Sequence, residues 1–245
     1  MGSSKLRKRM HKRFKAQLIS GAGPLRLASS RWLPPLYLGI MGHAEAQPRR
    51  YTVEEYFALE EASDMRHEFF EGEVFAMSGA GSVHNDIVQN FILTLRPKLR
   101  GSGCRVKIDG MRLAVRDEYY YTYPDVMVSC HPDDREATQQ YRHPVLIVEV
   151  SSPSTETYDR TQKFNQYQKL HSLRHYVLVS QKTWLVEWFR LTEHGVWAYT
   201  ALGEANDFIV IPELNLTLTL ADIYDETDIV PMRITPPSLP EDRAC

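Results

Sequence analysis

The feature that most constrains the fold is the unbroken apolar run Val145-Leu-Ile-Val148. It follows Pro144 and stops before Ser151-Ser-Pro153, so it is about as long as a β-strand. An unbroken apolar strand is typical of a sheet that is buried on both faces, because an exposed face would alternate polar residues into the run. We therefore predict an α/β fold with a mixed β-sheet flanked by helices.

The remaining patterns predict helices and hairpins around this strand. Thr52 and Glu55 have capping-box spacing, which predicts a short helix to about Glu61. Glu71-Gly72 predicts the turn of a hairpin, and Ser82 is the expected cap of a longer helix. Further strands are expected near residues 104–108, 112–115, 125–129, 176–179, 184–190, 196–200 and 208–211, and further helices at 156–170 and 218–223.

Charge divides the chain of 245 residues. Residues 1–40 hold nine of the 29 basic residues and none of the 31 acidic ones, so the rest of the chain is acidic. We interpret residues 1–45 as a basic, disordered extension, 46–228 as the domain and 229–245 as a proline-rich tail. The extension resembles a transit peptide, or an arm that binds nucleic acid or a membrane surface, and Met41 is an alternative start. An acidic domain does not coat nucleic acid through phosphate contacts alone, so it would need a local basic surface or metal ions.

The cysteines and the hydropathy exclude other classes. No run of about 18 apolar residues could span a membrane, which predicts a protein of the cytoplasm. Cys104, Cys130 and Cys245 have no CxxC spacing and are odd in number. They predict free thiols in a reducing compartment and argue against a structural zinc site.

Two acidic residues lie where a carboxylate is costly. Glu149 continues the apolar run, and Asp125 follows Pro124 at the start of another apolar strand. A buried carboxylate must be paired, hydrogen-bonded or bound to metal. Two carboxylates on neighbouring strands suit Mg²⁺. The alternative is structural: a buried salt bridge at Glu149 and a turn cap at Asp125.

A lysine follows on the next predicted helix. Asp159, Lys163 and Tyr167 are spaced by four and share a helix face, which a short connection would fold back over the end of the Glu149 strand. There Lys163 could orient a water molecule or stabilise charge that develops on a phosphate. The alternative is an ordinary solvated helix lysine.

Four ordered motifs resemble the Uma2 endonuclease family of the PD-(D/E)XK, or restriction-endonuclease-like, superfamily, over about residues 51–225. The motifs are Arg66-His-Glu-Phe-Phe-Glu-Gly-Glu-Val74, Tyr123-Pro-Asp-Val126, Val148-Glu-Val-Ser-Ser-Pro-Ser-Thr155 and Lys163-Phe-Asn-Gln-Tyr167. The third motif is the most specific. The resemblance implies a restriction-endonuclease-like core with additional hairpins.

The resemblance also implies the roles of individual residues. Asp125 and Glu149 match the two metal-binding acids. The superfamily lysine normally lies two residues after the second acid, where this chain has Ser151. Lys163 is our candidate for its replacement, and Ser151 is an accessory residue.

Three more residues have open assignments. Glu68 matches an early acid of the family and is a third metal ligand or one half of an ion pair. His84 is a proton shuttle, a phosphate contact or a surface histidine without a role, and Tyr167 is accessory or simply packs.

The expected function is hydrolysis of nucleic acid, with DNA favoured, by a homodimer that uses water activated by Mg²⁺ or Mn²⁺. The alternative is a catalytically inactive module that binds nucleic acid or protein.

Overall fold

The computed structural model describes residues 49–77, 79–108, 110–152 and 155–231. These residues belong to the unit Gln47–Cys245. The predictions for residues 1–45 and for the tail beyond Pro231 lie outside them. Among the described residues, no helix has both the length and the apolar character that crossing a membrane requires.

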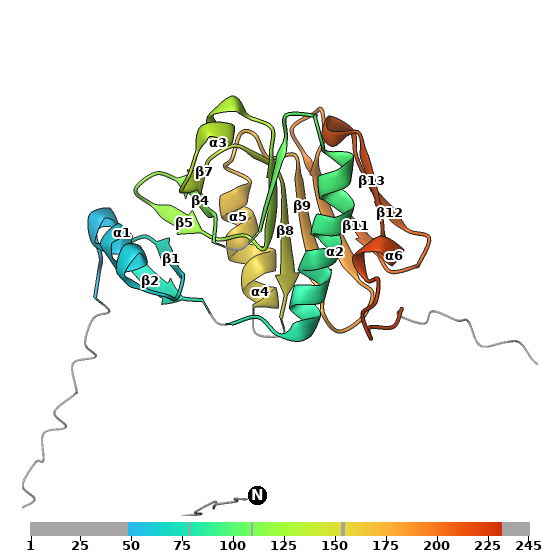
Figure 1. Cartoon of the computed structure of the whole chain (residues 1–245), viewed down its shortest axis with the longest axis horizontal. Coiled ribbons are helices and arrows are strands. Elements are labelled where there is room, and N and C mark those ends of the chain that lie inside the picture. The colour runs from blue at the N-terminus through green and yellow to red at the C-terminus, as the bar shows by residue number, and fades with distance from the viewer. Residues whose placement is uncertain (1–48, 78, 109, 153–154, 232–245) are drawn as a thin grey trace, which may run out of the picture. The chain divides into compact units, whose positions relative to one another are not determined.

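A six-stranded mixed sheet forms the centre of the domain (Figure 1), as the sequence predicted. Its strand order is β11-β10-β9-β8-β6-β3, and only the β8–β9 pair is parallel. The bounds are β3 Arg105–Ile108, β6 Val126–Ser129, β8 Pro144–Ser151, β9 His175–Ser180, β10 Val186–Leu191 and β11 Trp197–Leu202. The predicted apolar strand is β8, and its central residues are fully buried.

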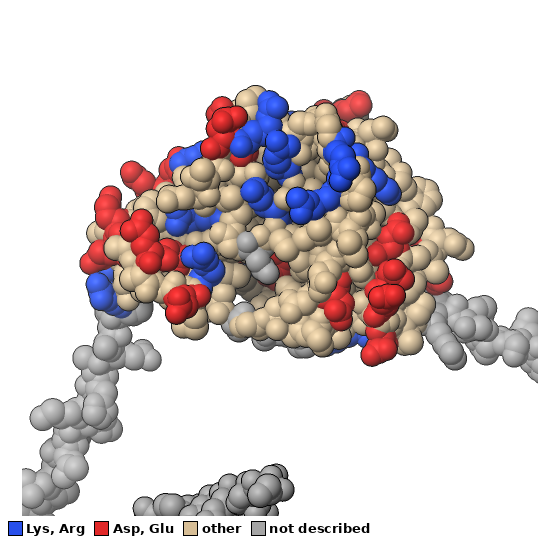
Figure 2. Space-filling view, viewed as in Figure 1, with Lys and Arg blue, Asp and Glu red and all other residues tan. Residues whose placement is uncertain are grey.

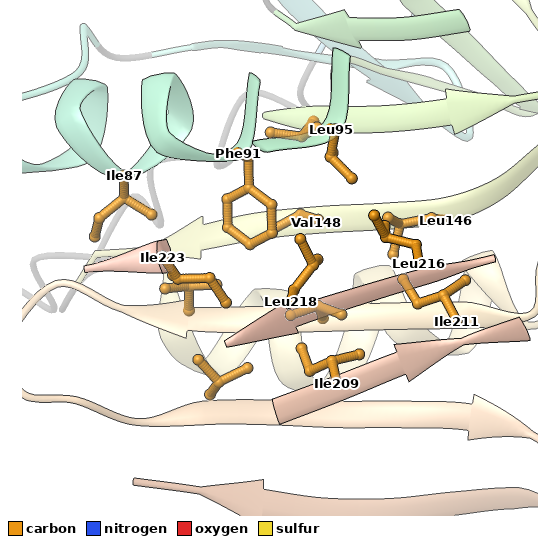
Figure 3. Close-up of a cluster of buried hydrophobic side chains, with 14 of the residues drawn as sticks. Ile87, Phe91, Leu95, Leu146, Val148, Ile209, Ile211, Leu216, Leu218 and Ile223 are labelled. Atoms are coloured by element: carbon orange, nitrogen blue, oxygen red, sulfur yellow. The ribbon is translucent and has the colours of Figure 1, made fainter. Parts of the chain in front are cut away.

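One face of this sheet is covered by helix α2 (Ser82–Lys98), by the hairpin β12 (Phe208–Ile211) and β13 (Leu216–Thr219), and by the short helix α6 (Leu220–Ile223). Figure 3 shows Ile87, Phe91 and Leu95 of α2 above Leu146 and Val148 of β8. The predicted cap of this helix is wrong by one residue: Gly81 is the N-cap, and Ser82 is the first residue of the helix.

The opposite face is covered by the connection from β8 to β9. Met127 and Ile147, which alternate with the residues facing α2, pack here against Tyr167 and Tyr176. We predicted one helix over 156–170. The structure instead has α4 (Glu156–Tyr158), a π-helical turn η1 (Asp159–Lys163) and α5 (Phe164–Tyr167). A crossover connection of this kind is what parallel strands require.

A second sheet has the order β2-β1-β5-β4-β7 and lies beside the helix α1 (Val53–Ala62). The Thr52–Glu55 capping box is present. The predicted hairpin is β1 (His67–Phe70) and β2 (Glu73–Ala76), with positive φ at both turn residues, as a type I′ turn requires. The other strands are β4 Arg112–Arg116, β5 Tyr120–Thr122 and β7 Gln140–Tyr141. Our prediction from the sequence missed β5, β7, β13 and the short helix α3 (Pro132–Glu136), and it placed Leu218 and Thr219, which end β13, in the helix that begins at Leu220.

The free-thiol prediction is wrong for two cysteines, because Cys104 and Cys130 form a disulfide bond. They lie just outside the β3–β6 ladder, which pairs Arg105 with Ser129. The next pair outward is the two cysteines, whose Cα atoms are 3.9 Å apart. The strand pairing, rather than any spacing in the sequence, brings them together.

Candidate active site

Antiparallel pairing of β6 and β8 brings the two predicted acids to the same end of the sheet. Val126 pairs with Val148, so the next pair along the ladder is Asp125 and Glu149. Directly opposite residues have Cβ atoms about 4.5–5.5 Å apart. The backbone N–H of Val150 donates a hydrogen bond of 2.7 Å to Oδ2 of Asp125, which holds this carboxylate against β8.

Lys163 comes from the π-helical turn η1 and is buried beside the acids. Its Nζ lies 3.2 Å from Oε1 of Glu149, 3.2 Å from Oε1 of Glu68 and 3.5 Å from Oδ1 of Asp159. It is therefore not the solvated helix lysine of the alternative interpretation. Its catalytic role stays a prediction.

Tyr167 and Ser151 hold the acids from behind. The Tyr167 hydroxyl donates a hydrogen bond of 2.7 Å to Oε1 of Glu149, and the Ser151 hydroxyl donates one of 3.1 Å to Oδ2 of Asp159. Ser151, which occupies the place of the superfamily lysine, thus bonds to the helix that carries Lys163. Both hydrogen bonds that Glu149 accepts from described residues fall on Oε1, which leaves Oε2 for a ligand.

Glu68 reaches the site from β1 of the second sheet. Besides its ion pair with Lys163, it accepts a hydrogen bond of 2.6 Å from Oγ1 of Thr122 and one of 3.4 Å from the hydroxyl of Tyr158. The ion pair of our alternative interpretation is present. Whether Glu68 also binds a metal stays a prediction.

His84 lies at the start of α2, on the other side of Asp125. Its Nε2 is 3.3 Å from Oδ1 of Asp125, and its side chain is largely buried. The structure therefore brings His84 to the acid pair rather than to a plain helix surface. This contact could not be read from the sequence, because it joins two segments about forty residues apart.

Burial and charge oppose each other in this cluster. Burial raises the pKa of Glu149 well above its ordinary value; Lys163 opposes this, and Asp125 and Asp159 add to it. Burial likewise raises the pKa of Asp159. Burial alone would lower the pKa of Lys163, but Glu149, Glu68 and Asp159 raise it well above its ordinary value. The neighbouring carboxylates thus outweigh burial at Lys163, whereas burial outweighs the lysine at Glu149 and Asp159.

These side chains face an open cleft of about 960 Å³ between the two sheets. Five acidic residues line it (Asp64, Glu68, Asp125, Glu149 and Asp159), beside the buried ammonium group of Lys163 and the guanidinium group of Arg66. Asp159 was not among our predicted site residues, although its spacing of four from Lys163 was the signal that could have identified it. Carboxylate oxygens in excess of positive charge form the donor set that a hard divalent cation prefers.

Known proteins resemble this chain over most of its length. The Synechocystis sp. (strain ATCC 27184 / PCC 6803 / Kazusa) protein named "Uncharacterized protein slr1290" is 32% identical over 186 residues, which are 76% of this chain and 97% of that protein. A second protein of the same strain, "Uncharacterized protein sll1609", is 31% identical over 157 residues, which are 63% of this chain and 89% of that protein.

A solved structure has the same fold. It comes from Anabaena variabilis ATCC 29413 and is described as "a putative nuclease belonging to DUF820". The TM-score is 0.59 at 17% sequence identity, and the match covers 71% of this chain and 97% of that one. This likeness confirms the predicted restriction-endonuclease-like fold.

The sequence also matches a family model across most of the described domain. The model is described as "Uma2: Putative restriction endonuclease", and it matches residues 53–221. All four motifs that carried the resemblance lie within that range. The chain therefore belongs to the Uma2 family.

Proposed function

We propose that this protein is a metal-dependent nuclease that hydrolyses phosphodiester bonds of nucleic acid, with DNA as the favoured substrate. The matched family and the structural neighbour are both described as nucleases. The observation that carries the proposal is the pairing of Asp125 and Glu149 beside Lys163, on the wall of an open cleft.

The residues fit Mg²⁺, and Mn²⁺ as its substitute. Asp125 and Glu149 would hold the ion, with Glu68 as a third ligand, because hard cations take carboxylate oxygens and retain water. The excess of carboxylates over positive charge in the cleft favours a divalent cation there. When bound, Mg²⁺ supplies Lewis acidity to a phosphoryl oxygen and makes a neighbouring water molecule more acidic.

The chain's own groups orient and charge the site. The Tyr167 hydroxyl and the Val150 N–H fix the two carboxylates in place. The Lys163 ammonium, 3.2 Å from Glu149, is close enough to stabilise negative charge that develops on the phosphate or to orient the attacking water. His84, beside Asp125, is our candidate for a phosphate contact or for transfer of the proton that the attacking water loses.

A local basic surface supports nucleic acid as the substrate of this acidic domain. Residues 87–108 contain no Asp or Glu, but they carry five basic residues, which we call the basic strip: Arg96, Lys98, Arg100, Arg105 and Lys107. The first four are exposed. The strip runs along β3 toward the acids but stops short of them: Arg105 pairs with Ser129 at the far end of β6, and Lys107 pairs with Met127, two residues after Asp125. Figure 2 shows Lys and Arg gathered over the C-terminal end of α2 and the adjoining sheet edge.

The decisive experiment uses the purified full chain with plasmid DNA, single-stranded DNA and RNA, each with Mg²⁺, Mn²⁺ or EDTA. We expect metal-dependent cleavage that falls at least about 100-fold in Asp125→Asn and Glu149→Gln, because a lost ligand costs no less than a lost outer-shell partner. Asp225→Asn, an exposed acid outside the cleft, is the matched control and should keep full activity. Cleavage in EDTA, or full activity of Asp125→Asn, would remove this mechanism.

The basic strip has its own test. Binding of duplex DNA by Arg100→Ala/Arg105→Ala should weaken, and the slope of log K against log salt should become shallower by about 2, close to one unit per lost phosphate contact. Lys169→Ala, an exposed lysine on the opposite face of the main sheet, should leave the slope unchanged. An unaltered slope in the double variant would mean that DNA follows another surface.

A second candidate is a binding module without catalysis. It is favoured by Lys163, which already neutralises part of the charge of Glu149 and Glu68 without a metal. Calorimetry with Mg²⁺ separates the two functions. Binding that is lost in Glu149→Gln supports the nuclease, whereas absence of binding by the wild-type chain supports the module.

The homodimer and the cytoplasmic location stay predictions. Two tryptophans of the C-terminal strands have partners within the domain: Trp188 is buried, and the Trp184 indole donates a hydrogen bond of 2.7 Å to the carbonyl of Ile229. Sedimentation of the full chain at several concentrations measures the oligomeric state directly.

A further inference from the structure

A second cluster of metal-binding side chains lies at the other end of β6 from the acid pair. His131 and Asp133 stand at the start of helix α3, and His143 stands just before β8. One ligand atom from each of the three lies within 4.8 Å of the other two. The two imidazole rings contact each other, with centroids 4.0 Å apart.

The distances within the cluster are close to those of a metal centre. Oδ2 of Asp133 is 3.7 Å from Nδ1 of His131 and 3.9 Å from Nε2 of His143. In a tetrahedral zinc site with bonds of about 2.0–2.2 Å, neighbouring ligand atoms are about 3.3–3.5 Å apart. Small side-chain rotations would therefore close the cluster around an ion.

The histidine that caps α3 would exchange one partner for another on binding an ion. Nδ1 of His131 accepts a hydrogen bond of 3.3 Å from the backbone N–H of Asp133. An imidazole nitrogen has a single lone pair, so an ion bound at Nδ1 would replace this hydrogen bond. The Asp133 carboxylate, 3.7 Å from the same nitrogen, would be the second ligand of that ion.

Two buried polar residues fix the backbone on both sides of the cluster. The Ser129 hydroxyl donates a hydrogen bond of 2.8 Å to the carbonyl of His143 and accepts one of 3.2 Å from the N–H of His131. The Asp134 carboxylate accepts hydrogen bonds of 2.9 Å from the N–H groups of Arg142 and His143. Ser129 and Asp134 are only 1% and 2% exposed. The two segments that carry the ligands are thus held together before any ion binds, which lowers the cost of assembling a site.

We propose that His131, Asp133 and His143 form a second metal site, selective for Zn²⁺ or another late first-row divalent ion. Two imidazoles and one carboxylate suit these ions, whereas Mg²⁺ prefers oxygen ligands alone. Three protein ligands leave the fourth position to water. The ion would join α3 to the segment that enters β8, and so it would stabilise the domain independently of the cleft.

The test is zinc binding by the metal-stripped full chain, followed by calorimetry in the presence of excess Mg²⁺ to occupy the acidic cleft. We expect one Zn²⁺ per chain at this site, and a loss of affinity of more than about tenfold in His131→Ala and in His143→Ala. His194→Ala, which removes another exposed histidine, is the matched control and should bind as the wild type does.

Two further measurements keep the proposal open to refutation. Because His131 and His143 are at the surface, both variants should keep the wild-type circular dichroism spectrum, and Zn²⁺ should raise the melting temperature of the wild type only. Unchanged zinc affinity in His143→Ala would overturn the site. So would zinc binding that disappears in Asp125→Asn/Glu149→Gln and survives in the histidine variants, because the ion would then belong to the cleft.

Discussion

Replacing Lys163 with methionine removes the ammonium group that three buried carboxylates share. The Nζ atom lies 3.2 Å from Glu149, 3.2 Å from Glu68 and 3.5 Å from Asp159. At an effective dielectric constant of about 20, one such contact is worth about 5 kcal/mol before desolvation. The carboxylates left behind can take up protons, so the net loss will be less than the sum. Breaking a buried ion pair typically costs about 3–5 kcal/mol, and we expect Lys163→Met to lower the free energy of unfolding by that amount near pH 8.

The loss should depend on pH with a definite sign. Burial already raises the pKa of Glu149, and removing the opposing cation raises it further. The folded variant then binds more protons than the unfolded chain, so its stability falls as the pH rises. The deficit should accordingly be largest near pH 8 and clearly smaller near pH 5.5.

Urea denaturation followed by tryptophan fluorescence, in EDTA at both pH values, measures this deficit. The matched control is Lys169→Met, which removes an exposed lysine whose ammonium group donates a hydrogen bond to Gln166, and it should change stability by less than about 0.5 kcal/mol. A deficit below about 1 kcal/mol for Lys163→Met near pH 8 would refute the reasoning. A deficit of equal size at both pH values would do the same, since the carboxylates would then not be the cause.

Three further predictions concern the fold. Burial lowers the pKa of His175, and its Nδ1 accepts a hydrogen bond from the indole of Trp188. Acidification from about pH 7.5 to about 5.5 should therefore lower the free energy of unfolding by about 1 kcal/mol in urea denaturation. The stability of His175→Gln should depend less on pH, and an equal pH dependence in both proteins contradicts this. The disulfide closes a loop of 26 residues, so Cys104→Ser/Cys130→Ser should lose about 3.5 kcal/mol of unfolding free energy under oxidising conditions, with no loss as the opposing result. Leu95→Ala, at a fully buried position of α2, should cost about 3–5 kcal/mol in the same assay, and a cost below about 1 kcal/mol would mean that the site collapses around the smaller side chain.

Elements with a strong local signal could be predicted from the sequence. The apolar run predicted β8, the capping box predicted α1, and Glu71-Gly72 predicted the first hairpin, since each depends on neighbouring residues alone. Strands β5 and β7 have only three and two residues, too few for a recognisable pattern. They are strands because they pair with strands that are distant in the sequence. The disulfide was missed for the same reason, because the β3–β6 register creates it.

The candidate site also combines residues that local patterns predict with contacts that only the fold creates. Asp125 and Glu149 could each be singled out, because a carboxylate inside an apolar strand is costly wherever it lies. That the two face each other follows from the β6–β8 register, which joins positions more than twenty residues apart. Glu68 arrives from another sheet and His84 from the helix α2, and no local pattern connects either residue to the acids.

The π-helical turn η1 explains how a lysine on a helical segment reaches the acid pair. Four residues of an α-helix turn through about 400°, so side chains spaced by four drift about 40° at each step. In a regular α-helix, Asp159, Lys163 and Tyr167 would still share a face but would spread over about 80° of it. The wider turn over Asp159–Lys163 takes up this drift and aligns the three side chains. A chain one residue shorter here would regain a regular helix and would turn Lys163 away from the acids. The position of the Lys163 ammonium group therefore depends on this one π-helical turn.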